Sequence, residues 1–313
     1  MHTTVRHLLS IADLTDTDLT QLIERGGGFA ARSPVVRSLA GAMAGIFFST
    51  TSTRTRTAFS AGAARLGAQT VAYGPGDLQL NTGESVEDTG RVLAGMLDLL
   101  VVRTAGDPAE LRALAAQDRM AVVNAMTVDE HPTQALSDLT TLMVHFGRIE
   151  GLKVLYVGEG NNTATALTLA LTRFPGVELE LRTPEGYGVP EAFLSRGAEQ
   201  AARYGASVVQ RHDMAGLGGF DVVYTTRWQT TGTSKPDPDW RRAFAPFQVT
   251  AELWRTSPDA VFLHDLPAHR GEEVTADVLD GPASIAFRQA RTKLASAMAV
   301  LEWCRPGFCD GAR

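Results

Sequence analysis

Short apolar runs alternate with amphipathic segments along most of the chain, and this alternation limits the fold more than any other feature. Strands that alternate with helical segments are typical of a parallel sheet with helices on its faces, because each parallel connection needs a crossover. The pattern therefore predicts an α/β fold. The expected strands lie at residues 41–49, 68–74, 98–104, 120–126, 152–157, 178–184, 219–227 and 259–267.

The segments between these strands carry apolar residues at helical spacing. Residues 13–28 predict a helix that Thr15 caps and that the glycines at 26–28 end. A further helix, with Phe59, Ala63 and Leu66 on one face, is expected directly after the first strand. The other expected helices lie at residues 84–96, 109–117, 131–147, 163–174, 191–205 and 284–304.

The strands form two blocks, one before and one after the expected helix at residues 131–147. A chain of 313 residues is long enough for two domains of ordinary size. Two α/β domains joined near this helix are the simplest interpretation.

Charge and cysteine content exclude several classes of function. The net charge is -6 and the pI about 5.7, so no large basic field recruits nucleic acid. Two cysteines, Cys304 and Cys309, do not make a disulfide framework. The N-terminus lacks the apolar core of a signal peptide, and no run approaches the ~20 apolar residues of a membrane span. We therefore expect a cytoplasmic protein that binds neither nucleic acid nor membrane.

Residues 47–59, FFSTTSTRTRTAF, place many hydroxyl groups and two arginines where a strand turns into a helix. Backbone N–H groups at the start of a helix attract anions, and the hydroxyls add donors. Arg54 and Arg56 lie roughly 200° apart around a helix, so only one of them can face a small anion. The segment predicts an anion site; an ordinary helix cap with solvated arginines is the alternative.

Residues 131–134, HPTQ, form a second candidate site. Pro132 suits the first turn of a helix, with His131 at its cap. Gln134 and Asp138 follow on roughly the same face. A histidine and an amide at a helix start could polarise a carbonyl group. The alternative is a capping histidine on a buried helix.

Residues 158–163, GEGNNT, follow the first strand of the second block. They hold the first two glycines of a dinucleotide-binding turn, but Thr163 replaces the third. Asn161 and Asn162 more plausibly supply amide hydrogen bonds to a small ligand. The alternative is a tight turn with an asparagine cap.

Two later strands end in polar residues, at 225–229 (TTRWQ) and 264–267 (HDLP). Ligands of open α/β sheets bind outside the carboxyl ends of the strands. Arg227 could hold a carboxylate with two hydrogen bonds, and Asp265 would be costly to bury without a cation. Each alone is more often part of a surface ion pair. The polar candidates here are Asp221, Arg227, Gln229 and Asp265.

Together these motifs resemble the aspartate and ornithine carbamoyltransferase family over nearly the whole chain. STRTR at 52–56 resembles the phosphate motif of that family, and HPTQ its second signature. The segments most similar to ornithine carbamoyltransferases are 78–93, 101–104, 147–162, 266–275 and 281–290.

The resemblance implies two doubly wound parallel-sheet domains. Residues 1–140 would bind carbamoyl phosphate, residues 141–288 would bind the amino-acid acceptor, and the helix within 289–313 would return to the first domain. It further implies a homotrimer with active sites between subunits, and neither a metal nor an organic cofactor.

The resemblance also implies roles for single residues. Ser52, Thr53, Arg54 and Thr55 would hold the phosphate, and Gln79 would come from a neighbouring subunit. Thr55, Arg103 and His131 would face the carbonyl oxygen of the carbamoyl group, and Gln134 its amide. Fixed donors around that oxygen stabilise the transition state more than the ground state. Leu266 and Lys293 complete the carbamoyl phosphate set, with Lys293 in place of an arginine.

The acceptor residues depart from the ornithine pattern. Asn162 and Asp221 match ornithine-binding positions, but Thr225, Thr226 and Arg227 replace the usual Ser-Met-Gly. With Gln229 they are similar to the aspartate enzymes instead, and Asp265 replaces a cysteine. Arg227 suits a carboxylate close to the reacting amine. Asp265, at the reaction centre, suits a second cationic group; acceptance of the proton from the reacting amine is its alternative catalytic role. These departures predict a short diamino acid such as 2,3-diaminopropionate as acceptor, with ornithine as the alternative.

Two interpretations from other classes stay open. A non-catalytic carbamoyl-phosphate-binding protein would release no phosphate with any amine. A dinucleotide-dependent dehydrogenase would bind NADH, although the sequence lacks the acidic residue expected after its second strand.

Overall fold

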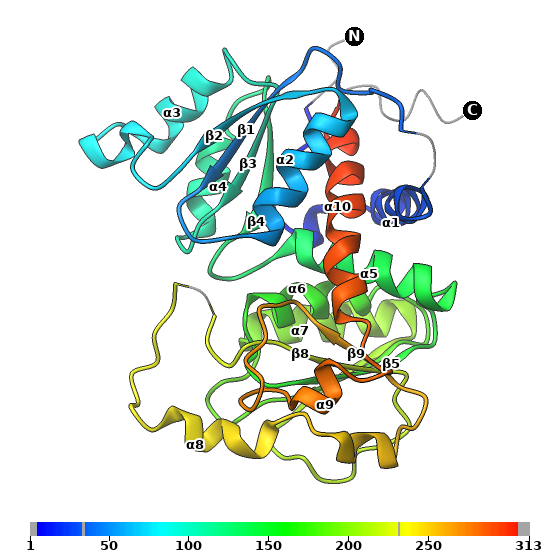
Figure 1. Cartoon of the computed structure of the whole chain (residues 1–313). Coiled ribbons are helices and arrows are strands. Elements are labelled where there is room, and N and C mark those ends of the chain that lie inside the picture. The colour runs from blue at the N-terminus through cyan, green and yellow to red at the C-terminus, as the bar shows by residue number, and fades with distance from the viewer. Residues whose placement is uncertain (1–4, 33–34, 231, 306–313) are drawn as a thin grey trace. The chain divides into compact units, whose positions relative to one another are not determined.

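The computed structural model describes residues 5–32, 35–230 and 232–305. The chain divides into two compact units, one made of Met1–Thr140 with Thr292–Arg313 and the other of Thr141–Arg291. None of the helices in the described parts has the length and apolarity needed to cross a membrane. The predicted α/β fold with parallel sheets is confirmed (Figure 1).

The first unit contains a four-stranded parallel sheet in the order β2-β1-β3-β4. Helices α3 and α4 lie on one side of it, and α2 and α10 on the other (Figure 1). The strands are β1 (Met43–Phe48), β2 (Gln69–Tyr73), β3 (Leu99–Arg103) and β4 (Ala121–Met126). The helices are α1 (Asp16–Ala30), α2 (Arg54–Leu66), α3 (Val86–Leu93) and α4 (Pro108–Leu114), with the first part of α5 (Pro132–Phe146) and most of α10 (Ala286–Trp303), two helices whose remaining residues count to the second unit.

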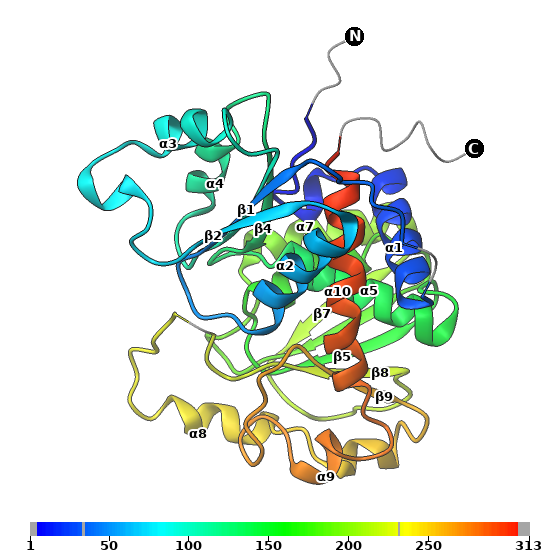
Figure 2. The same ribbon diagram turned by 45° about the horizontal axis from the view of Figure 1, so that its top comes forward.

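The glycines at 26–28 do not end α1, contrary to the expectation from sequence. Thr15 does cap the helix, in a capping box with Asp18, but the helix continues to Ala30. The reason is packing: a Cβ atom on Gly26 would lie 2.9 Å from the Thr140 hydroxyl and 3.6 Å from Ser296 Cα. Gly26 therefore serves close contact between helices, which outweighs its weak helix propensity (Figure 2 shows α1 beside α10).

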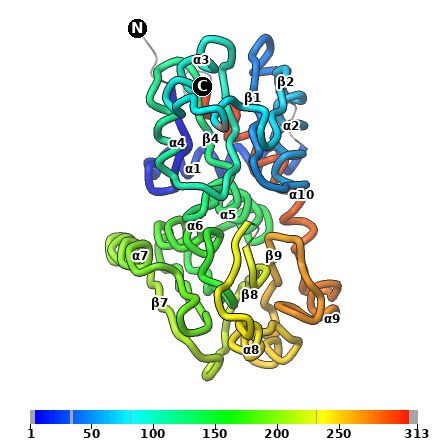
Figure 3. The backbone as a smooth tube through the Cα atoms, turned by 90° about the vertical axis from the view of Figure 1, so that its left-hand side faces the viewer, coloured from blue at the N-terminus to red at the C-terminus, as the bar shows by residue number. Residues whose placement is uncertain are grey.

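The second unit contains a five-stranded parallel sheet in the order β7-β6-β5-β8-β9. Figure 3 shows α6 and α7 on the side away from α9. The strands are β5 (Lys153–Val157), β6 (Glu178–Arg182), β7 (Ser207–Arg211), β8 (Val222–Thr225) and β9 (Val261–His264). The helices are α6 (Asn162–Leu171), α7 (Glu191–Tyr204), α8 (Trp240–Phe244) and α9 (Ala276–Leu279).

The sequence pattern missed β7, α8 and α9. Strand β7 is an edge strand that alternates between exposed and half-buried residues, so it lacks the apolar run that marked the other strands. Helices α8 and α9 have five and four residues, too few to show a helical period.

The structure describes only one of the two cysteines. Cys304 has a free and buried thiol, and burial raises its pKa to about 12. Such a thiol is inert at neutral pH. Cys309 lies outside the described residues.

The strand order reverses once in each sheet. From β1 the chain moves to β2 on one side and later to β3 on the other. From β5 it moves to β6 and then, later, to β8 on the opposite side. Loops that leave two such neighbouring strands run in opposite directions, which opens a crevice at the carboxyl ends of the strands. The two crevices lie after β1 and β3 and after β5 and β8.

Candidate active site

The STRTR motif lies at the crevice of the first unit, where α2 starts. Thr53 is the N-cap residue and makes no side-chain capping bond. Arg54 begins the helix and Thr55 is buried in its first turn. Backbone amides at the start of a 13-residue helix carry partial positive charge, so this turn suits an anion.

The two arginines of the motif separate, as their spacing predicts. The Arg56 guanidinium lies over the Phe48 ring, 6.0 Å from its centroid, at the end of β1. Arg56 therefore packs on the protein itself, at Phe48. Arg54 lies at the helix start with Ser52 and Thr53.

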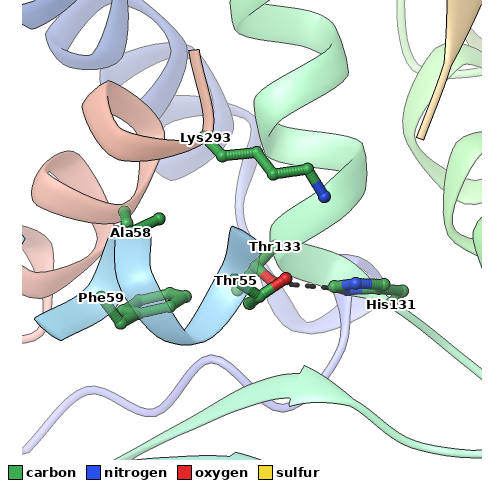
Figure 4. Close-up of a pocket in the computed structure, with 7 residues that line it drawn as sticks. Thr55, Ala58, Phe59, His131, Thr133 and Lys293 are labelled. Carbon is green, nitrogen blue, oxygen red and sulfur yellow. Dashed lines mark hydrogen bonds between the residues drawn. The ribbon is translucent and has the colours of Figure 1, made fainter. Parts of the chain in front are cut away.

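His131 lies at the centre of a second group in the same unit. It directly precedes α5, and its Nδ1 lies 3.3 Å from Thr133 Oγ1. Figure 4 shows His131, Thr133, Thr55 and Lys293 around one space. This cavity has a volume of about 10 Å³ and takes roughly one water molecule, or one oxygen atom of a ligand.

Burial and the neighbouring positive charges keep the His131 imidazole neutral. Burial, followed by the positive charges of Lys293 and Arg103, holds the pKa of His131 well below its ordinary 6.5. A neutral imidazole can donate one hydrogen bond and accept another. Arg103 ends β3 and is itself buried, with its backbone oxygen accepting from the Ser49 N–H at 3.0 Å.

Gln134 is held from both sides of its amide. Its Nε2 donates to Asp138 Oδ1 at 2.7 Å, and its Oε1 accepts from Lys293 Nζ. Lys293 comes from α10 and is buried. These bonds fix the orientation of the Gln134 amide next to His131.

Two further residues of the predicted carbamoyl phosphate set are Gln79 in the first unit and Leu266 in the second. Gln79 is exposed and begins a short 3-10 helix, Gln79–Thr82, where its Oε1 accepts from Thr82 Oγ1 at 2.9 Å. Leu266 belongs to the second unit, where its N–H donates to His264 Nδ1 at 2.8 Å. Its backbone φ is +54°, a value that non-glycine residues adopt rarely.

In the second unit, Asp265 follows β9 and reaches the start of α6. Its Oδ2 accepts from Thr163 Oγ1 at 3.1 Å, and its side chain is 19 % exposed. The preceding His264 is buried; because its Nδ1 accepts from Leu266, its Nε2–H faces Glu273 Oε1 at 3.2 Å. The strand end that carries Asp265 is thus rigidly held, while Asp265 itself can still be reached.

The carboxyl ends of β5 and β8 are joined by a network around Thr226. Its hydroxyl lies 2.9 Å from Tyr156 OH and accepts from Asn161 Nδ2 at 3.1 Å. Asn161 also caps α6, since its Oδ1 accepts from the Thr163 and Ala164 amides. Thr225 turns the other way, with its hydroxyl on Val157 O. Asn162, the first residue of α6, is buried.

Arg227 and Gln229 follow Thr226 and are both half-buried. Arg227 Nε is covered but has no hydrogen-bond partner within the described parts of the chain. Gln229 Nε2 donates to Thr233 O at 2.7 Å. A half-buried guanidinium with an unsatisfied donor suits an anionic group of a ligand.

Asp221 does not lie in this group, and its role as an acceptor residue stays a prediction. It precedes β8 and accepts from the Lys153 N–H at 2.8 Å, at the amino ends of β8 and β5. The length of a strand separates it from the edge where Arg227 lies. The resemblance that marked Asp221 as an acceptor residue does not show at which end of β8 the residue lies.

Other residues of the second crevice were missed from sequence. In the sequence Thr163 marks only a missing glycine, yet its hydroxyl donates to Asp265 Oδ2. Glu159 binds Thr230 Oγ1 and Lys235 Nζ. Lys235 lay in a stretch rich in Pro, Gly and Thr that predicts only a loop. The aromatic pair Trp240 and Phe244, spaced for one helix face, was the available signal that this loop is anchored.

Comparison with known proteins gives matches along the chain. Residues 6–144 match the aspartate/ornithine carbamoyltransferase carbamoyl-P binding domain, and residues 150–304 match the Asp/Orn binding domain. The ornithine carbamoyltransferase of Symbiobacterium thermophilum is 39% identical over 301 residues, which cover 95% of this chain and 96% of the relative. That of Bacillus subtilis is 35% identical, covering 95% of this chain and 93% of the relative. The structure of ornithine carbamoyltransferase from Pyrococcus furiosus matches with a TM-score of 0.89 and 36% identity, over 96% of this chain and 97% of that one.

The lowered pKa of His131 predicts a specific pH dependence of stability. Below about pH 6.5 His131 binds a proton in the unfolded chain but not in the folded chain. The free energy of unfolding therefore falls as pH falls. His131→Asn removes this contribution. Between about pH 7 and pH 5.5 the wild type should lose about 1 kcal/mol more unfolding free energy than the variant. Urea unfolding at both pH values checks this; equal losses in both proteins would show that His131 titrates normally.

Proposed function

The chain belongs to the aspartate/ornithine carbamoyltransferase family, and we propose that this carbamoyltransferase moves the carbamoyl group of carbamoyl phosphate to an amine of a diamino acid, releasing phosphate. One observation carries the proposal above the others. Thr55, His131 and Lys293 converge on an oxygen-sized space beside the anion-binding start of α2.

In the proposed mechanism the phosphate binds at residues 52–55, with Arg54 as its cation. The acceptor amine attacks the carbamoyl carbon in its uncharged form, and negative charge develops on the carbonyl oxygen. Thr55, neutral His131 and cationic Arg103 are donors for that oxygen, and fixed donors stabilise this charge without reorganisation. Gln134, oriented by Lys293, binds the carbamoyl amide. The bond between the carbamoyl carbon and the phosphate oxygen then breaks, and the leaving phosphate takes up the proton that the attacking nitrogen releases.

Ornithine is the acceptor that the relatives favour. All the relatives named above are ornithine carbamoyltransferases, with sequence matches along almost the whole chain. They support the ornithine alternative better than the 2,3-diaminopropionate that the sequence departures predicted. The side-chain amine of ornithine would attack to give the ureido product citrulline.

A short diamino acid stays as the second candidate because of Asp265 and Arg227. Asp265 is hydrogen-bonded yet reachable, so it can pair with an ammonium group of the acceptor. Such a pair must involve the amine that does not react, because an ammonium has no lone pair with which to attack. Arg227 Nε lacks a partner among the described residues, and the acceptor carboxylate would supply one. We further propose a cytoplasmic location, on composition and cysteine content alone.

Removal of Arg54 should weaken carbamoyl phosphate binding. Loss of a charged hydrogen-bonding partner costs about 2 kcal/mol, or roughly 30-fold in affinity. Arg65→Ala at the exposed last turn of the same helix is the matched control and should bind as the wild type does. Calorimetry without acceptor measures both. Unchanged affinity in Arg54→Ala would remove residues 52–55 from the phosphate site.

Acceptor choice should depend on Asp265. The measurement compares kcat/KM for ornithine and 2,3-diaminopropionate in the wild type, Asp265→Cys and Asp265→Cys with Arg227→Ala. If Asp265 selects a short diamino acid, each change moves the ratio toward ornithine, by about tenfold for one ion pair. A wild type that prefers ornithine strongly, with a ratio that Asp265→Cys leaves alone, would establish ornithine as the acceptor.

We propose that the active species is a homotrimer. Gln79 is exposed on its own chain, as a residue donated to a neighbouring subunit must be before assembly. Light scattering should give about three times the mass of the chain. Gln79→Ala should lower carbamoyl transfer while leaving that mass unchanged. A monomer with full activity would contradict the proposal.

A further inference from the structure

Lys235, in the loop after β8, lies among three aromatic rings. Its Nζ is 4.9 Å from the ring centroid of Tyr187, 5.2 Å from that of Trp240 and 4.9 Å from that of Phe244. We call these three rings the aromatic cage. The Lys235 side chain is only 4 % exposed. A lysine almost never reaches such burial unless it is paired.

The partner of Lys235 is Glu159, in the turn after β5. Lys235 Nζ and Glu159 Oε1 form an ion pair, and Glu159 Oε2 accepts from Thr230 Oγ1 at 3.2 Å. The two carboxylate oxygens of Glu159 thus hold two points of the chain that follows β8. The Glu159 side chain is only 16 % exposed, so water and salt screen this pair far less than a surface ion pair.

The aromatic cage and Glu159 act on the ammonium together. Each ring attracts the cation through its negative face, and the carboxylate balances the charge that burial leaves without water. The cage is itself packed, since Phe244 lies 5.3 Å from Trp240 and 4.9 Å from Tyr187 between ring centroids. Lys235 is therefore held at a fixed place rather than resting on a surface.

Arg227 and Gln229 lie between two anchors. On the N-terminal side, Thr226 is bonded to Tyr156 and Asn161 at the ends of β5 and α6. On the C-terminal side, Lys235 is bonded to Glu159. Trp228 packs against Phe244 of the cage, with ring centroids 5.7 Å apart. These contacts hold the described residues on both sides of Arg227 and Gln229.

We propose that Lys235 is a positioning residue for the acceptor: its ion pair with Glu159 inside the aromatic cage fixes the chain so that Arg227 and Gln229 face the acceptor amino acid. The inference rests on the proposed function, because it takes these two residues as acceptor-binding. Lys235 itself touches no reactant, since the rings and Glu159 enclose its ammonium. Without the pair, only a fraction of molecules holds the binding conformation, and the apparent affinity for the acceptor falls by that fraction.

The test measures steady-state kinetics with the better of ornithine and 2,3-diaminopropionate. Lys235→Met keeps the apolar stem and removes the charge. It should raise the acceptor KM about tenfold with kcat within about twofold, because a loss of binding-competent molecules is overcome by saturation. The affinity for carbamoyl phosphate, measured by calorimetry without acceptor, should stay unchanged. A loss of folding would instead lower kcat and both affinities together.

Two further variants separate positioning from simple destabilisation. Lys235→Arg keeps a cation that can pair with Glu159 and stack on the rings, so its acceptor KM should return to within about threefold of the wild type. Lys153→Met removes an exposed lysine paired with Glu178 in the same unit and should leave the acceptor KM alone. An unchanged KM in Lys235→Met, or an equal rise in Lys153→Met, would overturn the inference.

Glu159→Gln tests the pair itself. If the two residues act as one unit, Lys235→Met with Glu159→Gln should raise the acceptor KM no more than the larger single change. Effects that multiply would show that the pair does not act as a unit and would contradict the inference. If the wild type itself releases no phosphate with either amino acid, the proposed function fails, and that outcome is separate from any result on Lys235.

Discussion

The constraint on which the rest of the structure depends is the direction of the strands. All strands of each sheet run parallel, so their carboxyl ends share one edge. The order of strands reverses beside β1 and beside β5, and the loops there part to leave a crevice. Ser52–Thr55 and Arg103 are near each other only because β1 and β3 are neighbours. Asp221 follows the same rule at the opposite edge. It directly precedes β8 and so cannot reach the carboxyl ends of the strands.

Burial decides how the charges in the first crevice can act. Arg103 and Lys293 are cations with little contact with water, and both lower the pKa of His131. A positive charge on the buried imidazole beside these two cations would be costly, so His131 stays neutral over the physiological pH range.

Much of the fold could be predicted from sequence because it rests on local pattern. Buried strands such as Leu99–Arg103 are apolar runs, and the residues after them are polar, so both the sheet and its ligand edge can be read. What could not be predicted depends on partners distant in sequence. Gly26 stays helical because Thr140 and Ser296 leave no space for a side chain. Glu159 and Lys235 meet across 76 residues, in a loop whose composition signals only the absence of regular structure.

The two candidate regions differ in how closely sequence determines them. The start of α2 offers the backbone amides of one helix turn, and a short motif marks it. The connections after β8 and β9 carry side chains such as Arg227 and Asp265, which can change without disturbing the sheet. The identity of 35–39% to ornithine carbamoyltransferases over 95–96% of the chain therefore supports carbamoyl transfer more directly than the choice of acceptor. In the role proposed for Lys235, the aromatic cage is the support that lets side chains after β8 change while the chain that carries them stays in place.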